Sequence, residues 1–477
     1  MTLAQECAWA VWRGIVVALP AVWIASALCA VVDGGSQKPA SRGRRVVRGL
    51  IWAVMLAPLL TPTLLVAYAW RPTALAWVRD PAWVEWLYRG LLLARYAPVA
   101  ALVLLLAPPP PVSAQAMHAG QLLGRRFQPG LWWRGPARRA IVAGAAVFLL
   151  SFTEFEIAWL LDIRTWTAVI FDAQAARVPL DQMLRMALLP LACQAAVVVP
   201  VIWLVLCDTR LSGQTAPPRL RGVGSIVTTG LYLPVAFVLG CGYPLWIVAA
   251  GAVRGLRPLL RQDLTVGTLQ QLGFGVRQGA LAAVAAVAIA LLLRRTHRGA
   301  ATVACVPGLF GPLIVGMLTM TLFRWLPLRG VYDTIVPLSL AHMVWLLPIA
   351  VLLVALLGPR RAQAMHAAHL LRQAATPELQ RCGRRLIGHL WVRPLIWAGF
   401  ILFCMAYFEL TATAMLAPAG ATPATVMAYN NMHYGQYDVL SARVLMSLLL
   451  ALLLFALVAA AAKGMQRSAK FKVQIAK

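Results

Sequence analysis

Three carboxylates stand in stretches of this sequence that are otherwise apolar. Glu154 and Glu156 fall within the predicted helix 140–161, and Glu409 falls within the predicted helix 395–417. Glu154 and Glu409 each lie about fourteen residues into their helix, which is roughly 21 Å at the α-helical rise. A carboxylate at that depth in a membrane is costly and usually faces a polar interior. We therefore expect Glu154 and Glu409 to line a polar path, unless each accepts hydrogen bonds from a neighbouring helix or its helix ends earlier and leaves it in water.

A six-residue sequence, AQAMHA, occurs twice, at Ala114–Ala119 and at Ala362–Ala367, and includes His118 and His366. His366 and His369 are spaced i, i+3 and could share a helix face, but no acidic or thiol residue stands beside them to complete a metal site. The sequence contains no G-x-x-x-x-G-K-[ST] pattern, and its 8 cysteines form no C-x-x-C pair. We expect no nucleotide site, metal or cofactor in this chain, and no enzymatic activity.

The composition is that of a protein embedded in a membrane. Of the 477 residues, 61% are hydrophobic and 12% are charged, and the mean hydropathy is +0.76. The charged fraction is about half of that in typical soluble domains. Several apolar runs reach the roughly 20 residues needed to cross a bilayer, so we predict an all-α polytopic membrane protein with about 11 transmembrane helices. The predicted helices are 9–32, 49–70, 90–108, 140–161, 183–206, 226–252, 278–293, 301–323, 333–357, 395–417 and 440–462.

The strongly basic charge balance fits a membrane protein better than a nucleic-acid-binding protein. The net charge is +28, from 43 Lys and Arg against 15 Asp and Glu, but no basic domain lies outside the apolar runs. When the connections between predicted helices are taken alternately, one set holds most of the basic residues and includes 109–139, 207–225, 358–394 and the tail from Lys463. Basic residues collect in cytoplasmic loops. We therefore predict the N-terminus outside and the C-terminus in the cytoplasm.

The order of these features repeats along the chain. Each copy of AQAMHA begins a long basic loop, which is followed by a proline and then by a helix that carries a carboxylate. We interpret the chain as two homologous halves fused in parallel. Residues 1–210 would form the first half with about five transmembrane helices, 211–225 a cytoplasmic linker, and 226–477 the second half with about six.

Two stretches of the sequence, Ser151–Leu161 and Phe408–Leu452, carry a resemblance to a known family. The second contains an E-L-x-A-T-x-x-L-x-P-x-G pattern. With the topology and the long loops, these stretches resemble the permease subunits of bacterial binding-protein-dependent ABC importers, in particular the fused two-copy type associated with ferric iron and thiamine. The matching positions of the pattern are Glu409, Leu410, Ala412, Thr413, Leu416, Pro418 and Gly420.

The resemblance implies a docking segment in each long loop. In the family an E-A-A-x-x-x-G motif forms a short helix that docks into a separate ATPase subunit, and neither copy here has the glutamate of that motif. The matching positions are Ala114, Gln115, Ala116 and Gly120 in the first half, and Ala362, Gln363 and Ala364, or alternatively Ala374 and Ala375, in the second. The implied partners are two copies of the ATP-binding subunit, a periplasmic solute-binding protein and membrane lipid.

The function implied by the resemblance is that of a permease in the bacterial inner membrane. It would move a small solute, such as ferric iron or thiamine, by alternating access, and the ATPase would supply the energy. Two alternatives stay open on the sequence. The chain could be a proton-coupled secondary transporter with duplicated halves, in which the buried glutamates carry protons, or a degenerate membrane scaffold that transports nothing.

Other polar or breaking residues in the apolar runs carry smaller expectations. Arg95 and Arg185 are expected to extend toward lipid headgroups, whereas Arg13 has no identifiable partner in the sequence. Gly240–Gly242 with Pro244 could break the sixth predicted helix, as in transporters whose broken helices line a binding site. The alternative is a simple kink.

Overall fold

The computed structural model of this chain is helical throughout the part that it describes, where no strand occurs. Eight of the described helices are long and apolar enough to cross a membrane, and two further helix pairs, bent by 76° and 95°, bring the number to at most ten. The predicted all-α polytopic membrane protein is thus confirmed, and the described residues contain fewer candidate spans than the roughly 11 predicted. The described residues are 2–33, 42–77, 79–106, 137–206, 223–261, 264–296, 298–357, 362–373 and 376–470.

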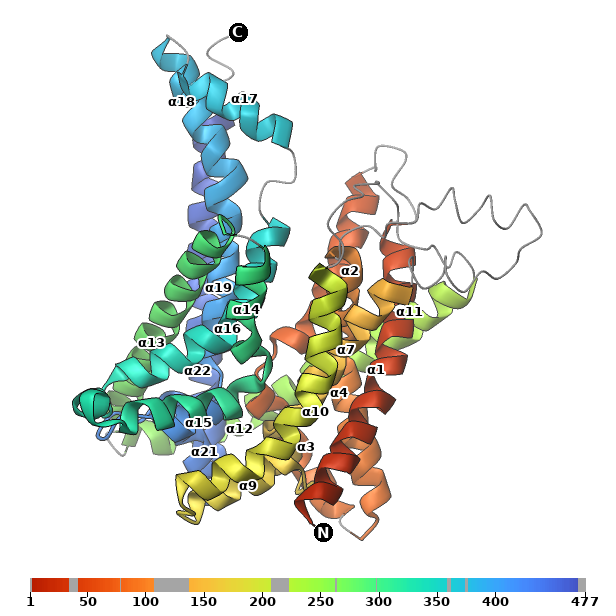
Figure 1. The fold of residues 1–477 in the computed structure, drawn as a ribbon, viewed down its shortest axis with the longest axis vertical. Coiled ribbons are helices and arrows are strands. Elements are labelled where there is room, and N and C mark those ends of the chain that lie inside the picture. Colours follow the sequence, from red (N-terminus) through yellow and green to blue (C-terminus); the bar gives the residue numbers. More distant parts are fainter. Residues whose placement is uncertain are drawn as a thin grey trace. The chain divides into compact units, whose positions relative to one another are not determined.

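The chain divides into two compact units, Met1–Val248 (unit 1) and Ala249–Lys477 (unit 2). In unit 1, α1, α4 and α7 pack against one another (Figure 1). The rings of Phe148, Phe152 and Trp166 form a row in its interior, with centroids 5.6 and 5.4 Å apart. The elements that lie in or begin in unit 1 are α1 (Leu3–Asp33), α2 (Arg42–Leu60), α3 (Thr63–Ala76), α4 (Pro81–Leu106), α7 (Arg138–Phe152), α8 (Glu156–Leu160), α9 (Trp166–Ala175), α10 (Leu180–Leu206), α11 (Val223–Phe237), the π-turn η2 (Val238–Gly242) and α12 (Tyr243–Arg261).

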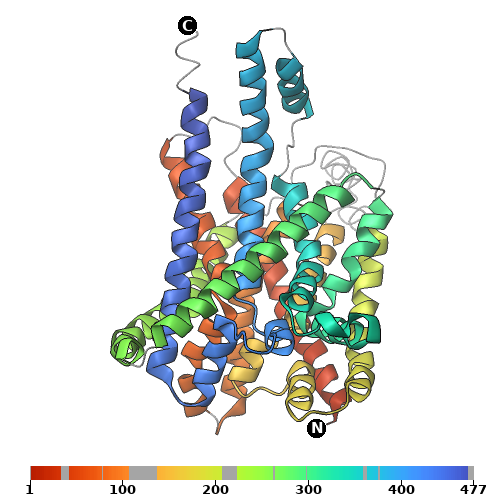
Figure 2. The same cartoon turned by 90° about the vertical axis from the view of Figure 1, so that its left-hand side faces the viewer.

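In unit 2, α13 packs against α16 and α19, and Figure 2 shows it running obliquely across the blue helices. The core between these helices is made of alanine, larger aliphatic and aromatic side chains, including Ala286, Leu346 and Phe403. The remaining elements are α13 (Leu264–Leu293), α14 (Arg298–Leu309), α15 (Gly311–Arg324), the 3-10 turn η3 (Leu326–Val331), α16 (Ile335–Leu357), α17 (Ala362–Gln373), α18 (Pro377–Ile387), the π-turn η4 (Gly388–Val392), α19 (Arg393–Tyr407), α20 (Thr411–Leu416), α21 (Ala424–His433) and α22 (Tyr437–Lys470).

The two units are divided between Val248 and Ala249, within α12, and not at the predicted linker 211–225. The reason is that α11, the first helix of the predicted second half, packs against α1, α2 and α4 of unit 1. Most of the predicted linker, up to position 222, lies outside the described residues.

The elements of the two units follow the same order. A long helix (α1 or α13) is followed by a bent pair, a second long helix (α4 or α16), a helix that ends early (α7 or α19), two short helices and a last long helix (α10 or α22). A close contact recurs as well. A Cβ added at Gly14 would lie 2.7 Å from the ring of Phe148, and one added at Gly279 would lie 3.2 Å from the ring of Phe403. In each unit, a glycine of the first helix therefore allows close packing against the helix that ends early.

The run Val223–Leu260 is continuous, so Gly240–Gly242 does not break it. Instead, η2 forms a π-turn there. A Cβ added at Gly240 would lie 2.6 Å from Pro58 Cβ of α2, so only glycine fits this close contact. The indole nitrogen of Trp70 donates to the Leu239 carbonyl over 2.9 Å, which satisfies a backbone group at the irregular turn. The feature is a bulge that accommodates helix packing and not a broken helix.

The two helices α17 and α18 form a hairpin at the end of unit 2 opposite α21 (Figure 1). A Cβ added at Gly383 of α18 would lie 2.8 Å from the Ala368 carbonyl oxygen of α17, so the two helices approach closely. Residues Pro377–Tyr407 make one continuous helical run. The hairpin is therefore joined directly to α19 and to the residues that follow it.

Candidate functional site

The helices that were expected to carry Glu154 and Glu409 end before reaching them. α7 ends at Phe152 and α19 ends at Tyr407, so neither glutamate lies about fourteen residues inside a helix. The predicted helices 140–161 and 395–417 are wrong in this respect. Both glutamates are nevertheless buried, with 6% and 5% of their surface exposed. An early helix end therefore leaves each of them inside the protein and not in water.

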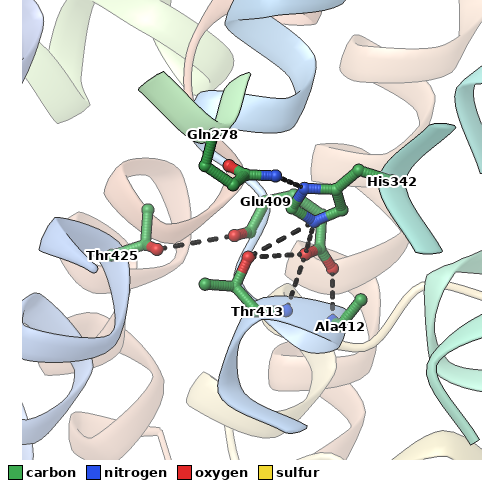
Figure 3. Close-up of polar contacts among 6 residues, drawn as sticks. All are labelled: Gln278, His342, Glu409, Ala412, Thr413 and Thr425. Carbon is green, nitrogen blue, oxygen red and sulfur yellow. Dashed lines mark hydrogen bonds and ion pairs between the residues drawn. The ribbon is translucent and has the colours of Figure 1, made fainter. Parts of the chain in front are cut away.

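In unit 2 the Glu409 carboxylate caps the first turn of α20. Its Oε1 accepts from the backbone N–H of Ala412 over 2.7 Å, and its Oε2 accepts from the backbone N–H of Thr413 over 3.1 Å. The Thr413 hydroxyl also donates to Oε2 over 3.1 Å, and Thr425 of α21 donates to the Glu409 carbonyl over 3.5 Å (Figure 3). Amide donors at the start of a helix have no partner within the helix, so a carboxylate satisfies them.

His342 of α16 completes this cluster from a neighbouring helix. Its Nε2 lies 2.8 Å from Oε2 of Glu409, and the side chains of the pair are 0% and 3% exposed. The other ring nitrogen, Nδ1, is hydrogen-bonded to the Gln278 amide of α13. Figure 3 shows His342 held between Gln278 on one side and Glu409 with Thr413 on the other. Four elements of unit 2 thus supply the cluster.

Unit 1 builds the corresponding arrangement around Glu154. Its Oε1 accepts from the backbone N–H of Ile157 over 2.7 Å, and its Oε2 accepts from that of Ala158 over 3.1 Å. The Thr167 hydroxyl of α9 donates to the Glu154 carbonyl over 3.0 Å. The two backbone hydrogen bonds have the same residue spacings and distances as those that Glu409 makes with α20. The repeated order of elements therefore extends to individual hydrogen bonds.

The side-chain partner from the second long helix differs between the units. In unit 1 the hydroxyl of Tyr88 on α4 lies 3.4 Å from Oε2 of Glu154, where unit 2 has the imidazole of His342. The guanidinium of Arg13 on α1 lies 5.9 Å from the centroid of the Tyr88 ring, where unit 2 has Gln278. A neutral phenol thus faces the carboxylate in unit 1, and an ionisable imidazole faces it in unit 2.

The cluster in unit 2 has the groups needed to hold a proton. An imidazole can be neutral or protonated near neutral pH, and the group hydrogen-bonded to one ring nitrogen sets the tautomer of the other. The amide of Gln278 can serve both forms, because its nitrogen donates to a bare Nδ1 and its oxygen, after a half-turn, accepts from a protonated Nδ1. The phenol of Tyr88 offers no such exchange near neutral pH.

The three arginines discussed from the sequence, Arg13, Arg95 and Arg185, each have a partner within the protein. Arg95 does not extend to headgroups, because its Nη1 donates to the Thr61 carbonyl over 2.6 Å at the break between α2 and α3. Arg13 does have a partner: Nε lies 2.8 Å from Glu85 Oε1, and Nη2 donates to the other oxygen over 2.9 Å. Arg185 is exposed and lies 4.0 Å from the Asp181 carboxylate. The two partly buried arginines, Arg13 and Arg95, bind protein groups and not lipid.

The predicted docking positions are described only in part. Ala114, Gln115, Ala116 and Gly120 lie outside the described residues, as do His118, Ala374 and Ala375. Ala362, Gln363 and Ala364 form the first turn of α17. His366 and His369 are exposed on the same helix. Among the described residues, no group of three or more His, Cys, Asp and Glu is placed to hold a metal ion.

Sequence reasoning did not single out His342, Gln278 or Tyr88. A signal for the first was present, because His342 is a lone ionisable residue within the apolar helix 333–357, and such residues are usually paired inside a membrane protein. Gln278 stands at the start of the predicted helix 278–293, where a polar residue is unremarkable. Tyr88 lies two residues before the predicted helix 90–108, where aromatic residues are common in membrane proteins.

Comparisons of the chain with protein-family models, with curated proteins and with solved structures find no match. The geometry of the two glutamate clusters and of the α17–α18 hairpin is therefore the basis for a functional proposal.

Proposed function

We propose that this chain is the permease subunit of a bacterial binding-protein-dependent ABC importer. It would move a small solute, of the class carried by ferric-iron and thiamine permeases, across the inner membrane by alternating access. Two copies of a separate ATPase subunit would drive it and a periplasmic solute-binding protein would supply the solute. The N-terminus would lie outside and the C-terminus in the cytoplasm, following the distribution of basic residues.

The observation that carries the proposal is the continuous helical run Pro377–Tyr407. It begins in the α17–α18 hairpin, which contains the second predicted docking segment, and ends two residues before Glu409. If an ATPase displaced the hairpin, α19 would therefore move with it and would displace Glu409 and the α20 helix that Glu409 caps. Packed helices transmit such displacements because protein interiors are close to incompressible.

A second support is the repeated construction of the two units. An importer driven by two ATPase copies needs two related receiving parts, and the matching hydrogen bonds of Glu154 and Glu409 show that the chain builds one local structure twice. In this proposal the two glutamates line the translocation path. Their caps hold the short helices α8 and α20 in place.

The test is co-purification from cells that express the tagged chain together with its ATPase. Gly383→Leu should abolish recovery of the ATPase, because any side chain at this position meets the backbone of α17 and drives the hairpin apart. Gly388→Ala is the matched control, since nothing lies within 4 Å of a Cβ there. Recovery of no ATPase with the unmodified chain, or equal recovery with Gly383→Leu, contradicts the proposal.

A second candidate function is proton-coupled secondary transport, which the buried pair of His342 and Glu409 favours. Proton carriers in transporters are ionisable side chains that are shielded from lipid and paired, and Gln278 can accommodate both protonation states of the ring. Uptake into proteoliposomes separates the two functions. An importer needs ATP and its ATPase, whereas a proton-coupled transporter needs only the chain and a pH gradient, and would lose its pH dependence in His342→Gln.

A further inference from the structure

A second buried cluster in unit 2 takes no part in the interactions of Glu409. Arg443 of α22 is 6% exposed. Its Nε and Nη1 atoms are buried and have no hydrogen-bond partner among the described residues. An arginine remains charged in proteins, and a buried charge without a partner is strongly unfavourable. The guanidinium therefore requires an acceptor that the described part of the chain does not supply.

Two hydroxyl groups lie close to Arg443 on α22 and α19. Ser447 follows one turn later on the same face of α22, and its hydroxyl donates to the Arg443 carbonyl over 3.0 Å. The buried Tyr407 hydroxyl of α19 lies within hydrogen-bonding reach of Ser447, and neither hydroxyl is bonded to Nε or Nη1 of the guanidinium. Ring contacts of Phe455 with Trp397 and Phe400, at 5.4 and 5.7 Å, confirm that α19 and α22 face each other.

A second unpartnered donor lies on the next element. The Nδ2 atom of Asn431, on α21, is buried and without a partner in the described chain, and α21 packs against α22. The nearest carboxylate in sequence, Asp438, lies 3.3 Å from Arg254. Buried donors on two helices that pack together, Arg443 and Asn431, thus have no acceptor among the described residues.

Unit 1 shows that this arginine need not be buried. In α10, Arg185 follows Asp181 by four residues, lies 4.0 Å from it, and is 79% exposed. In α22, Arg443 follows Asp438 by five residues. One additional residue turns a side chain by about 100° around a helix. This shift moves the arginine from an exposed face to a buried one and separates it from the aspartate.

We propose that Arg443, with Asn431 on the adjoining α21, forms a binding site for an oxyanion. The ligand is a carboxylate or phosphate group, because a guanidinium fork binds these planar or tetrahedral oxygens through two parallel hydrogen bonds. The group is carried either by a soluble solute or by the headgroup of a phospholipid. The inference does not depend on the proposed import function, since it rests on the unpartnered donors of α21 and α22.

The experiment measures thermal unfolding of the purified, delipidated full-length chain in a neutral detergent. One arm adds inorganic phosphate against chloride at equal ionic strength, and the other adds phosphatidylglycerol against phosphatidylcholine. A ligand that binds only the folded state raises the unfolding midpoint. We expect a rise in one arm, and the arm identifies the source of the group. No rise in either arm overturns the proposal.

Variants assign the effect to the site. Arg443→Met should weaken binding by about 10- to 100-fold, the value of one or two charge-assisted hydrogen bonds, while its midpoint without ligand equals or exceeds that of the unmodified chain. Arg185→Met is the matched control and should respond as the unmodified chain does. If Arg443→Met does not fold, Asn431→Ala tests the site through a smaller rise. An unchanged response in either site variant overturns the proposal.

Discussion

Replacing Glu409 by Gln should destabilise the protein more than replacing Glu154 by Gln. Both changes keep the shape of the side chain, and both place an amide NH₂ group against a backbone N–H donor of the following short helix. They differ in what faces the carboxylate. Glu409 faces the imidazole of His342 at 2.8 Å, whereas Glu154 faces the phenol of Tyr88 at 3.4 Å.

The magnitudes follow from these partners. Loss of the hydrogen bonds to a charged cap costs about 1–3 kcal/mol, which is the expected effect of Glu154→Gln. Glu409→Gln also removes the buried hydrogen bond between His342 and the carboxylate, so we expect it to cost about 1.5–3 kcal/mol more than Glu154→Gln. The double substitution of His342 and Glu409 should recover about 1–3 kcal/mol relative to the sum of the single changes. The pair of Tyr88 and Glu154 should recover less than about 1 kcal/mol, because its hydrogen bond is long.

The assay is unfolding in mixed micelles with a rising fraction of sodium dodecyl sulfate, followed by the fluorescence of the 18 tryptophans. Tyr88→Phe and His342→Gln complete the two cycles. Equal destabilisation by Glu154→Gln and Glu409→Gln would refute the reasoning. So would a coupling energy near zero between His342 and Glu409, because the two buried side chains would then not stabilise each other.

Three further substitutions test the packing within the units, and one labelling experiment tests the predicted orientation of the chain in the membrane. Gly14→Ala should destabilise unit 1 by about 1–3 kcal/mol, because the added carbon lies 2.7 Å from the Phe148 ring, whereas Gly273→Ala should stabilise α13 by up to about 1 kcal/mol, since nothing lies near its Cβ; thermal unfolding compares the two. Arg95→Met should speed hydrogen exchange at the break between α2 and α3, because it removes the donor to the Thr61 carbonyl; unchanged exchange would contradict that role. Cys382, which is exposed on α18, should react with a membrane-impermeant maleimide in inside-out vesicles and not in intact spheroplasts, and the reverse result would overturn the predicted orientation.

The fold class follows from the sequence because apolar runs of membrane-spanning length are visible without any knowledge of packing. The ends of the helices do not follow as readily. The runs that contain Glu154 and Glu409 continue in hydrophobic residues beyond both glutamates, so hydropathy extends the helices past Phe152 and Tyr407. The actual ends depend on the carboxylates, which cap the short helices that follow. Composition alone does not reveal that competition.

The sequence identifies only part of the candidate site, again because it does not show how the helices pack. A glutamate in an apolar stretch attracts notice because it is expensive there, and both glutamates are indeed buried. Their partners come from α4, α13 and α16, and the sequence gives no register between those helices and the glutamates. His342 could have been found as a lone ionisable residue, but its pairing with Glu409 needs tertiary structure. The burial of Arg443 likewise depends on a single additional residue after Asp438.

Cross-linking from Cys382 tests the proposed import function most directly. A variant that keeps Cys382 as its single cysteine would be treated, in membranes containing its ATPase, with a short thiol-to-amine reagent, and the cross-linked peptides identified by mass spectrometry. The proposal predicts a cross-link to a subunit with a G-x-x-x-x-G-K-[ST] sequence, and its loss when Gly383→Leu is added. Cross-links to lipid or to this chain alone, with no nucleotide-binding subunit, would contradict the assignment of α17 and α18 as the docking hairpin.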